Sequence, residues 1–343
     1  MGKPFKILSI DGGGIKGLYS STILEHLEAE FECRISDHFD LLCGTSTGGL
    51  IALGLSQKIS AEDISDIYKE KGDEIFPSRS PWMRWFEWIE EKYFGGKFFP
   101  GQTFWFGKYN NENLKAILES MFGGKRVKDT NNLLCIPTYS VTDGRPWVFK
   151  YDHKEGNLSR DNEALYVDVA LATSAAPTYL PIHEISFYNN KQFVDGGVWA
   201  NNPTLVGVIE AIRYFVGPGK EYDSLQVLSI SSLSNAKGKP TGWRKKRSFI
   251  GWRGDLFDVS MNGQSMFTDY IMSSLAITDT IPIEYYRIPS ADISHEQVQL
   301  VDMDATSKKC IDLLCGKGND MGTLYRKKDE IKSFFASHKT YQI

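Results

Sequence analysis

The sequence has no excess of basic residues, no long apolar run, and few cysteines or histidines. Its 39 lysine and arginine residues are outnumbered by 43 acidic ones, giving a formal net charge of −4. Nucleic acid is therefore not expected as the main partner. The longest apolar run, near residues 49–55, is far shorter than the roughly 20 residues that span a bilayer. Any contact with a membrane is expected to be peripheral.

The five cysteines do not form the pattern of a disulfide framework. They are Cys33, Cys43, Cys135, Cys310 and Cys315, an odd number, and the first three fall in or beside apolar segments. This favours reduced thiols in a cytoplasmic protein. Cys310 and Cys315 lack zinc-site spacing and neighbouring histidines, so no metal is expected. The first residues enter a predicted strand at once, leaving no room for a signal peptide.

The segment from residue 39 to 55 is predicted to form a strand, a tight turn and a helix. Phe39–Cys43 is an apolar run of strand length, and the apolar residues after Gly48 indicate a buried helix. The turn between them reads Gly-Thr-Ser-Thr-Gly, in which flanking glycines let strand and helix pass closely while Ser46 is exposed in a strained conformation. Ser46 is thus a candidate nucleophile. An ordinary loop of small residues is the alternative.

A second strand, turn and helix opens the chain. Phe5–Ile10 is the strand, and Asp-Gly-Gly-Gly-Ile-Lys-Gly follows at 11–17. The glycines satisfy a dinucleotide-binding pattern, but the next strand leads to Ser46 and not to an acidic residue. Bare backbone N–H groups at a helix start form a cradle for an anion. That anion is either a phosphate or a tetrahedral oxyanion.

Asp195 ends a third such strand, before Gly196 and Gly197. Pro203 begins the helix that follows. Because the carboxyl ends of strands meet at one crevice in an open α/β sheet, we expect Asp195 and Ser46 to lie together.

The rest of the chain alternates strands and helices as far as residue 231. Strands are expected at Leu133–Val141, Trp147–Tyr151, Leu225–Ser231 and Ile281–Ile288. Helices are expected at 60–76, 110–122, Val167–Thr173, Thr204–Phe215, 260–276 and 304–338. Twelve aromatic residues crowd into 82–109, which indicates a cap on the core or a surface for membrane and acyl chains. Residues 235–255 are basic and glycine-rich, which indicates a solvated loop or a contact for anionic headgroups or a phosphate-bearing ligand.

Four motifs, in order and spacing, resemble the patatin-like phospholipase family. They are Asp-Gly-Gly-Gly-x-Lys-Gly at 11–17, Gly-Thr-Ser-Thr-Gly at 44–48, Ser-Ala-Ala-Pro-Thr-Tyr-Leu-Pro at 174–181 and Asp-Gly-Gly at 195–197. The resemblance covers roughly the first 215 residues. It implies a three-layer α/β/α sandwich of the patatin type, with a mostly parallel central sheet and a Ser-Asp pair that works without histidine.

By position, the resemblance makes Ser46 the nucleophile and Asp195 its base. The oxyanion hole would be the backbone amides of Gly12, Gly13 and Gly14. The supporting residues would be Asp11, Lys16, Gly17, Gly44, Gly48, Gly196 and Gly197. Lys16 stands where the family often has arginine, which matters if the side chain must bind in a bidentate way.

The resemblance also implies how the chain is organised. Residues 5–216 would form the hydrolase core, with an aromatic cap inserted at about 77–109. Residues 217–343 would continue the same domain with the basic loop 235–255 and a C-terminal helical extension.

The implied activity is that of a serine acyl hydrolase without a cofactor, acting on membrane phospholipids from the cytoplasm at the inner face of the membrane. Residues 142–152 look similar to bacterial patatin-like effectors of anti-phage signalling, in which a cyclic oligonucleotide switches on lipid degradation. A cyclic di- or trinucleotide is therefore an expected activator. DNA and RNA are not expected, and a homo-oligomer is left open.

Two other hypotheses for the function stay open at this point. In the first, His295 or His338 completes a Ser-Asp-His triad, since both follow Asp195 in the chain. In the second, the protein is a nucleotide-binding sensor whose glycine loop holds phosphates and whose Ser46 is only structural.

Overall fold

The computed structural model describes residues 3–75, 110–233, 255–276 and 282–343. The predicted aromatic cap and all but the end of the basic loop lie outside these ranges. Eight strands form one sheet in the order β5-β6-β3-β2-β1-β7-β8, with β4 paired to β3. Their bounds are β1 Pro4–Ile10, β2 Leu41–Gly44, β3 Leu133–Ser140, β4 Arg145–Lys150, β5 His183–Ile185, β6 Lys191–Asp195, β7 Ser224–Ile230 and β8 Ile283–Ile288.

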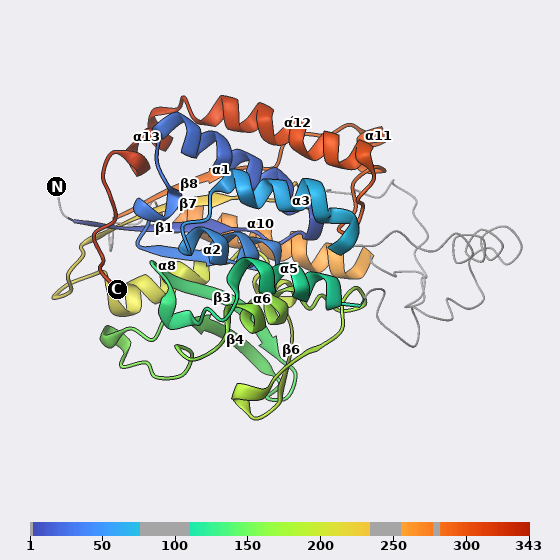
Figure 1. Ribbon diagram of the computed structural model, residues 1–343. Coiled ribbons are helices and arrows are strands. Elements are labelled where there is room, and N and C mark those ends of the chain that lie inside the picture. The colour runs from blue at the N-terminus through green and yellow to red at the C-terminus, as the bar shows by residue number, and fades with distance from the viewer. Residues whose placement is uncertain (1–2, 76–109, 234–254, 277–281) are drawn as a thin grey trace, which may run out of the picture.

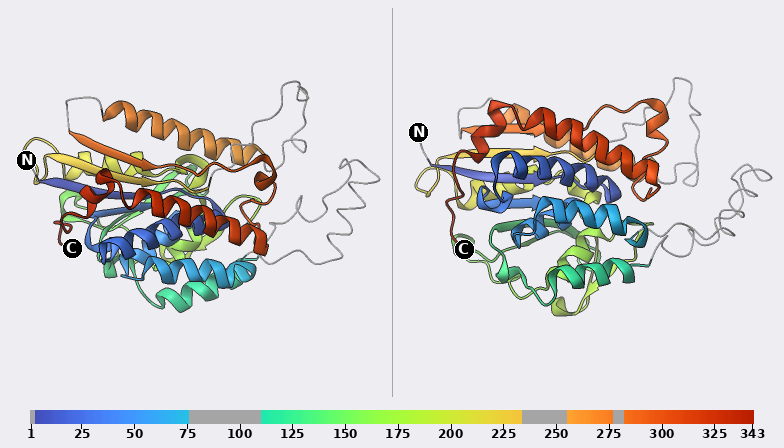
Figure 2. Two further views of the ribbon diagram at one scale, coloured as in Figure 1. Left: turned by 90° about the horizontal axis from the view of Figure 1, so that it is seen from above. Right: turned by 45° about the horizontal axis from the view of Figure 1, so that its top comes forward.

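Helices cover both faces of the sheet, which gives the predicted three-layer sandwich (Figures 1 and 2). One face carries α1 Gly17–Phe31, α2 Thr47–Ser56, α3 Ala61–Ile75, α5 Glu112–Phe122, α6 Tyr166–Ser174, α12 Lys308–Tyr325 and α13 Asp329–Phe335. The other carries α8 Thr204–Tyr214 and α10 Asp255–Leu275. Two short helices are α7 Gly197–Ala200 and α11 His295–Val298, and the 3₁₀ turns are Gly14–Lys16, Ile35–Asp37, Val127–Asp129, Lys154–Gly156 and Ser186–Tyr188.

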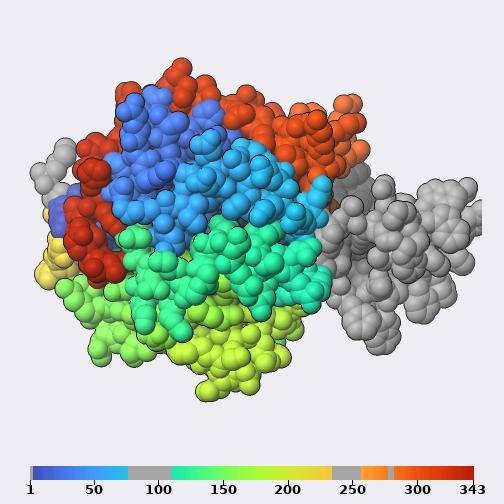
Figure 3. Space-filling view, viewed as in Figure 1, coloured from blue at the N-terminus to red at the C-terminus, as the bar shows by residue number. Residues whose placement is uncertain are grey.

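The central strands are apolar on both faces because both faces are covered. In β1, Leu8 and Ile10 belong to the core under α1 and α2, while Phe5 and Ile7 belong to the core under α8. This is the pattern of a parallel sheet buried between helix layers. The C-terminal helices α12 and α13 lie directly beside the N-terminal helix α1 on the outer surface (Figure 3).

Strand β6 differs from the expected arrangement because it runs antiparallel. It pairs with the last residues of β3, Thr138–Ser140, whereas β2 pairs with the first residues of β3, Leu133–Cys135. Because β4 occupies the opposite edge of β3, β2 and β6 lie on the same edge. Strands β2 and β6 therefore approach each other end to end along β3, so their last residues face one another. Two other elements also differ from the prediction. The helix predicted over 304–338 is divided into α12 and α13, and strand β5 was not predicted.

The turn after β2 depends on the absence of a side chain at Gly44. A Cβ added there would lie 2.0 Å from the carbonyl oxygen of Gly48. We expect Gly44→Ala to lower the free energy of unfolding by about 3 kcal/mol or more, since neither backbone segment can yield. Denaturant unfolding measures this change. The control is Gly124→Ala, whose added Cβ meets no atom within 4 Å; equal losses in both variants would contradict the close approach.

Candidate active site

Ser46 lies in the turn between β2 and α2 with a strained backbone. Its φ is 54° and its ψ is −125°, a combination that a residue with a Cβ rarely adopts. Hydrogen bonds from three successive residues hold the turn: Thr45 Oγ1 donates to Ala200 O, Ser46 N to Thr173 Oγ1, and Thr47 Oγ1 to Gly14 O, at 2.6, 3.0 and 2.7 Å. The turn is thereby fixed to three different parts of the chain, one of which is the glycine loop.

Asp195 ends β6 and is 1% exposed. Its carboxylate accepts a hydrogen bond from the Ser46 side chain and another, of 2.6 Å, from the Gly197 N–H. Burial raises the pKa of Asp195 to about 7, against these two hydrogen bonds, which lower it. At neutral pH the carboxylate is thus poised to take a proton, as a general base requires.

The glycine loop lies against the Ser46 turn. A Cβ added to Gly12 would be 3.3 Å from the Cβ of Ser46. Gly14 has φ 60°, and its own added Cβ would lie 2.2 Å from the carbonyl oxygen of Met303. That same carbonyl accepts a 2.9 Å hydrogen bond from the Ile15 N–H. The loop is therefore held between the serine turn and the C-terminal part of the chain.

The three amides expected to form the oxyanion hole are not equivalent. The Gly12 N–H donates to the Asn201 carbonyl at 3.0 Å, so in this conformation it is already engaged. The N–H groups of Gly13 and Gly14 have no acceptor among the described residues. Of these three, the amides of Gly13 and Gly14 are therefore the ones left to stabilise an anion beside Ser46.

The other predicted residues support these loops. Gly17 and Gly196 are sites of close packing, with added Cβ atoms 1.7 Å from the Thr47 side chain and 2.3 Å from the Pro137 carbonyl oxygen. Lys16 is buried near Cys310. Burial raises the pKa of Cys310 to about 11, and the positive charge of Lys16 acts in the opposite direction. Asp11 forms an ion pair with Arg287. Gly44 and Gly48 shape the Ser46 turn.

Neither candidate histidine reaches the Ser46–Asp195 pair. His295 is exposed in α11. His338 packs on His38, with ring centroids 4.8 Å apart, at the amino end of β2. Within the described part of the chain, no histidine hydrogen-bonds to Ser46 or Asp195. The hypothesis of a Ser-Asp-His triad therefore has no geometric support.

The described ranges contain no group of three or more histidine, cysteine or acidic side chains that could hold a metal ion. In the same ranges, every helix is too short or too polar to cross a bilayer.

A small, largely apolar pocket lies beside Ser46. Helices α2, α3 and α5 and two loops contribute its apolar walls: Leu50, Tyr68, Ile75, Leu114, Leu180 and Met303. Ser46, Thr47 and Gly14 form one end of it. Its apolar walls suit the apolar part of an ester whose carbonyl reaches the serine.

Sequence reasoning missed several residues that hold the site together. Thr45 and Thr173 fix the serine turn, and Ser232 donates a 2.8 Å hydrogen bond to the Gly12 carbonyl. The threonines on both sides of Ser46 were a visible signal, because polar residues there must find buried partners. Ser232 and Arg287 gave no local signal, since their partners lie far away in the chain.

Together, the sandwich fold, the strained turn at Ser46 and the buried Asp195 carboxylate beside it indicate an ester hydrolase. The model of the patatin-like phospholipase family matches residues 8–208. The chain therefore belongs to the patatin-like phospholipase family, and it is a carboxylic ester hydrolase.

Relatives of known name extend the likeness beyond the matched region. The chain is 31% identical over 304 residues to a cGAMP-activated phospholipase from Pseudomonas aeruginosa, covering 88% of this chain and 85% of the relative. A protein of the same name from Vibrio cholerae is 28% identical over 351 residues, covering 96% and 94%. Patatin-like protein 2 of Oryza sativa subsp. indica is 31% identical over 265 residues, covering 68% and 62%.

The raised pKa of Asp195 predicts how stability depends on pH. The folded-state pKa of Asp195, about 7, exceeds the ordinary value of 3.8, so the folded protein binds a proton at Asp195 more tightly than the unfolded chain does. The free energy of unfolding therefore falls as the pH rises from about 4 through 7. Asparagine carries no charge to bury. We expect Asp195→Asn to be more stable than the wild type by up to about 4 kcal/mol at pH 8, and by less than about 1 kcal/mol at pH 4.

Urea unfolding of both proteins at the two pH values measures this difference. The control is Asp143→Asn, because Lys191 lowers the pKa of Asp143, so its replacement should give the opposite sign. An Asp195→Asn variant with the same advantage at pH 4 and pH 8 would contradict the burial of an ionised carboxylate.

Proposed function

We propose that this chain releases fatty acid from membrane phospholipids through a Ser46–Asp195 dyad. The supporting observation is the hydrogen bond from the Ser46 side chain to a buried carboxylate with a pKa of about 7. In this proposal Ser46 is the nucleophile and Asp195 is its general base. The Gly13 and Gly14 amides bind the oxyanion.

The reaction needs only groups that the site contains. Asp195 takes the Ser46 proton as Oγ attacks the ester carbonyl, and the carbonyl oxygen becomes an oxyanion near the Gly13 and Gly14 amides. The ester bond then breaks, and the leaving alcohol takes the proton from Asp195. Water, deprotonated by Asp195, next attacks the acyl-serine; the bond to Ser46 Oγ breaks, Asp195 returns the proton to Oγ, and the fatty acid is freed. A positioned base contributes about 10²- to 10⁴-fold, and each oxyanion donor about 3 kcal/mol.

The proposal includes activation by a cyclic nucleotide. Two relatives that match nearly the whole chain are named cGAMP-activated phospholipases. By this likeness, a cyclic dinucleotide switches on lipid degradation in antiviral defence. The protein then acts in the cytoplasm, at the inner face of the membrane.

Release of fatty acid from phospholipid vesicles, with and without cGAMP, tests the dyad and the activation together. We expect cGAMP to raise the rate for the wild type, and Ser46→Ala and Asp195→Asn to lower it by a factor of about 10⁴ or more. His295→Ala and His338→Ala should stay active. The control is Ser56→Ala, at the far end of the same helix α2.

The outcomes of this experiment separate the parts of the proposal. Release that persists in Ser46→Ala would overturn the dyad. Ser46-dependent release that no cyclic nucleotide changes would leave the hydrolase in place and remove the activation.

The pocket beside Ser46 predicts which substrates depend on its walls. Ala176 lines the pocket and is buried, so Ala176→Trp would fill space meant for an acyl chain. We expect kcat/KM for a palmitoyl ester to fall about 10-fold or more, and that for an acetyl ester to stay within about 3-fold. The control is Ile209→Trp, on the exposed face of α8. Equal losses on both esters would place the acyl chain elsewhere.

A further inference from the structure

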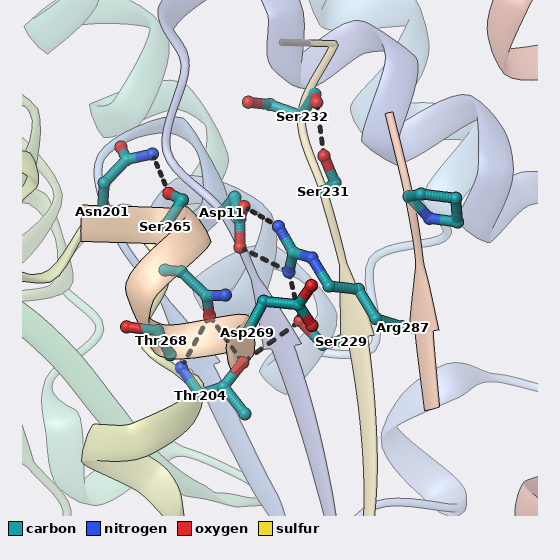
Figure 4. A network of polar contacts seen from close by, with 12 residues as sticks. Asp11, Asn201, Thr204, Ser229, Ser231, Ser232, Ser265, Thr268, Asp269 and Arg287 are labelled. Carbon is teal, nitrogen blue, oxygen red and sulfur yellow. Dashed lines mark hydrogen bonds and ion pairs between the residues drawn. The ribbon is translucent and has the colours of Figure 1, made fainter. Parts of the chain in front are cut away.

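A buried ion pair joins strand β8 to the residue that precedes the glycine loop. Arg287 contacts the Asp11 carboxylate with both terminal nitrogens (Figure 4). Nη2 lies 2.5 Å from Oδ2, and Nη1 lies 3.2 Å from Oδ1. The side chain of Asp11 is 3% exposed and that of Arg287 is 14% exposed. Two-point contact of this kind fixes the orientation of the carboxylate as well as its distance.

The pair bridges three neighbouring strands at their carboxyl ends. Strand β7 lies between β1 and β8, and its Ser229 hydroxyl accepts a 2.5 Å hydrogen bond from Arg287 Nη1. Asp11 is also held through its backbone, since its N–H donates to the Ile230 carbonyl at 3.0 Å. Main chain and side chain thus both anchor the residue from which the glycine loop starts.

We propose that Arg287 is a positioning residue for the oxyanion loop, acting through Asp11 on the amides of Gly13 and Gly14. The inference rests on the proposed function, because it assigns a role in the same reaction. Glycines have no side chains with which to fix their own backbone, so the direction of their N–H groups depends on what holds the loop at its ends. Arg287 holds the first end, and the contact between Ile15 and Met303 holds the second.

Arg287 lies outside the region that the family model matches. That region ends at residue 208, whereas β8 begins at Ile283. The charge that orients the oxyanion loop is therefore supplied by the C-terminal third of the chain. A truncation after the matched region would keep Ser46, Asp195 and the glycines and would lose their support.

Helix α10 adds a second layer of polar contacts around the pair. Asp269 of α10 accepts a 2.7 Å hydrogen bond from Tyr285, and its charge raises the pKa values of Arg287 and Asp11. One turn earlier, Ser265 accepts a 3.0 Å hydrogen bond from the side-chain amide of Asn201. The backbone carbonyl of Asn201 is the acceptor for the Gly12 N–H. Figure 4 shows Asp11, Ser229 and Arg287 together where β1, β7 and β8 end, with Asp269 of α10 beside them. Arg287 thus sits between two carboxylates, which makes an apolar replacement a change in charge as well as in shape.

Steady-state hydrolysis of a short, water-soluble ester by the full chain tests the proposal. For Arg287→Met we expect kcat to fall about 10- to 100-fold with KM within about 2-fold, because a displaced amide weakens the transition state more than the bound substrate. Arg287→Lys should recover part of kcat, since it restores the charge without the two-point contact. Asp11→Asn should match Arg287→Met, and the double variant should lose little more than either.

The control for a purely structural role is Lys150→Met. It removes another partly buried ion pair, with 2.5 Å between Lys150 and Glu210, from β4 and α8. We expect a fall in melting temperature similar to that of Arg287→Met, with kcat within about 2-fold of the wild type. An unchanged kcat in folded Arg287→Met, or an equal loss of kcat in Lys150→Met, would overturn the proposal. Should Arg287→Met not fold, Arg287→Lys and Asp11→Asn carry the same comparison.

Failure of this inference is distinguishable from failure of the proposed function. Hydrolysis that survives Ser46→Ala would remove the proposed function whatever Arg287 does. Hydrolysis that needs Ser46 but is indifferent to Arg287 and Asp11 would remove only the positioning role.

Discussion

Asp195 is buried beside Ser46 with two hydrogen bonds to its carboxylate, fewer than the four or so that a carboxylate accepts in water. Its environment therefore disfavours the negative charge and favours a proton. A serine hydroxyl is a poor acid, so a base near its ordinary pKa would take its proton reluctantly. In the proposed mechanism, burial supplies the missing basicity, and the surrounding loops must exclude water to keep it. The other features of the site serve to hold this carboxylate, the serine and the glycine amides in place.

The sheet brings the two side chains together through an unusual use of one strand edge. Strand β3 is long enough to pair with β2 over its first residues and with antiparallel β6 over its last. The two shorter strands meet head to head, so the turn after β2 and the turn after β6 face each other. Thr45 closes the junction by donating to Ala200, in the segment that follows Asp195. The relative position of Ser46 and Asp195 is thus set by the pairing of β2 and β6 with β3.

How much of this could be read from the sequence depends on how local each signal is. Ser46 lies between Gly44 and Gly48, and Asp195 precedes Gly196, each at a strand end, so both were predicted as site residues without a structure. The direction of β6 was not, because an isolated strand of five residues carries no sign of its partner's orientation. Gly12 was expected to donate to the oxyanion, but its N–H faces the Asn201 carbonyl, a partner contributed by a distant turn. The aromatic segment 82–109 and most of the basic loop lie outside the described residues, so those two predictions stand untested.

Arg287 shows why the matched family region does not explain the site by itself. The motifs at 11–17, 44–48 and 195–197 contain every group that touches the reacting atoms in the proposed mechanism, yet the glycine loop is fixed from outside them. One end is held by Arg287 in β8 and the other by the Met303 carbonyl, both in the last fifth of the chain. A movement of β8 or of the segment at Met303 would therefore reach the glycine loop directly. The C-terminal third thus contributes to the site through the backbone of the glycine loop, although none of its residues touches the reacting atoms in the proposed mechanism.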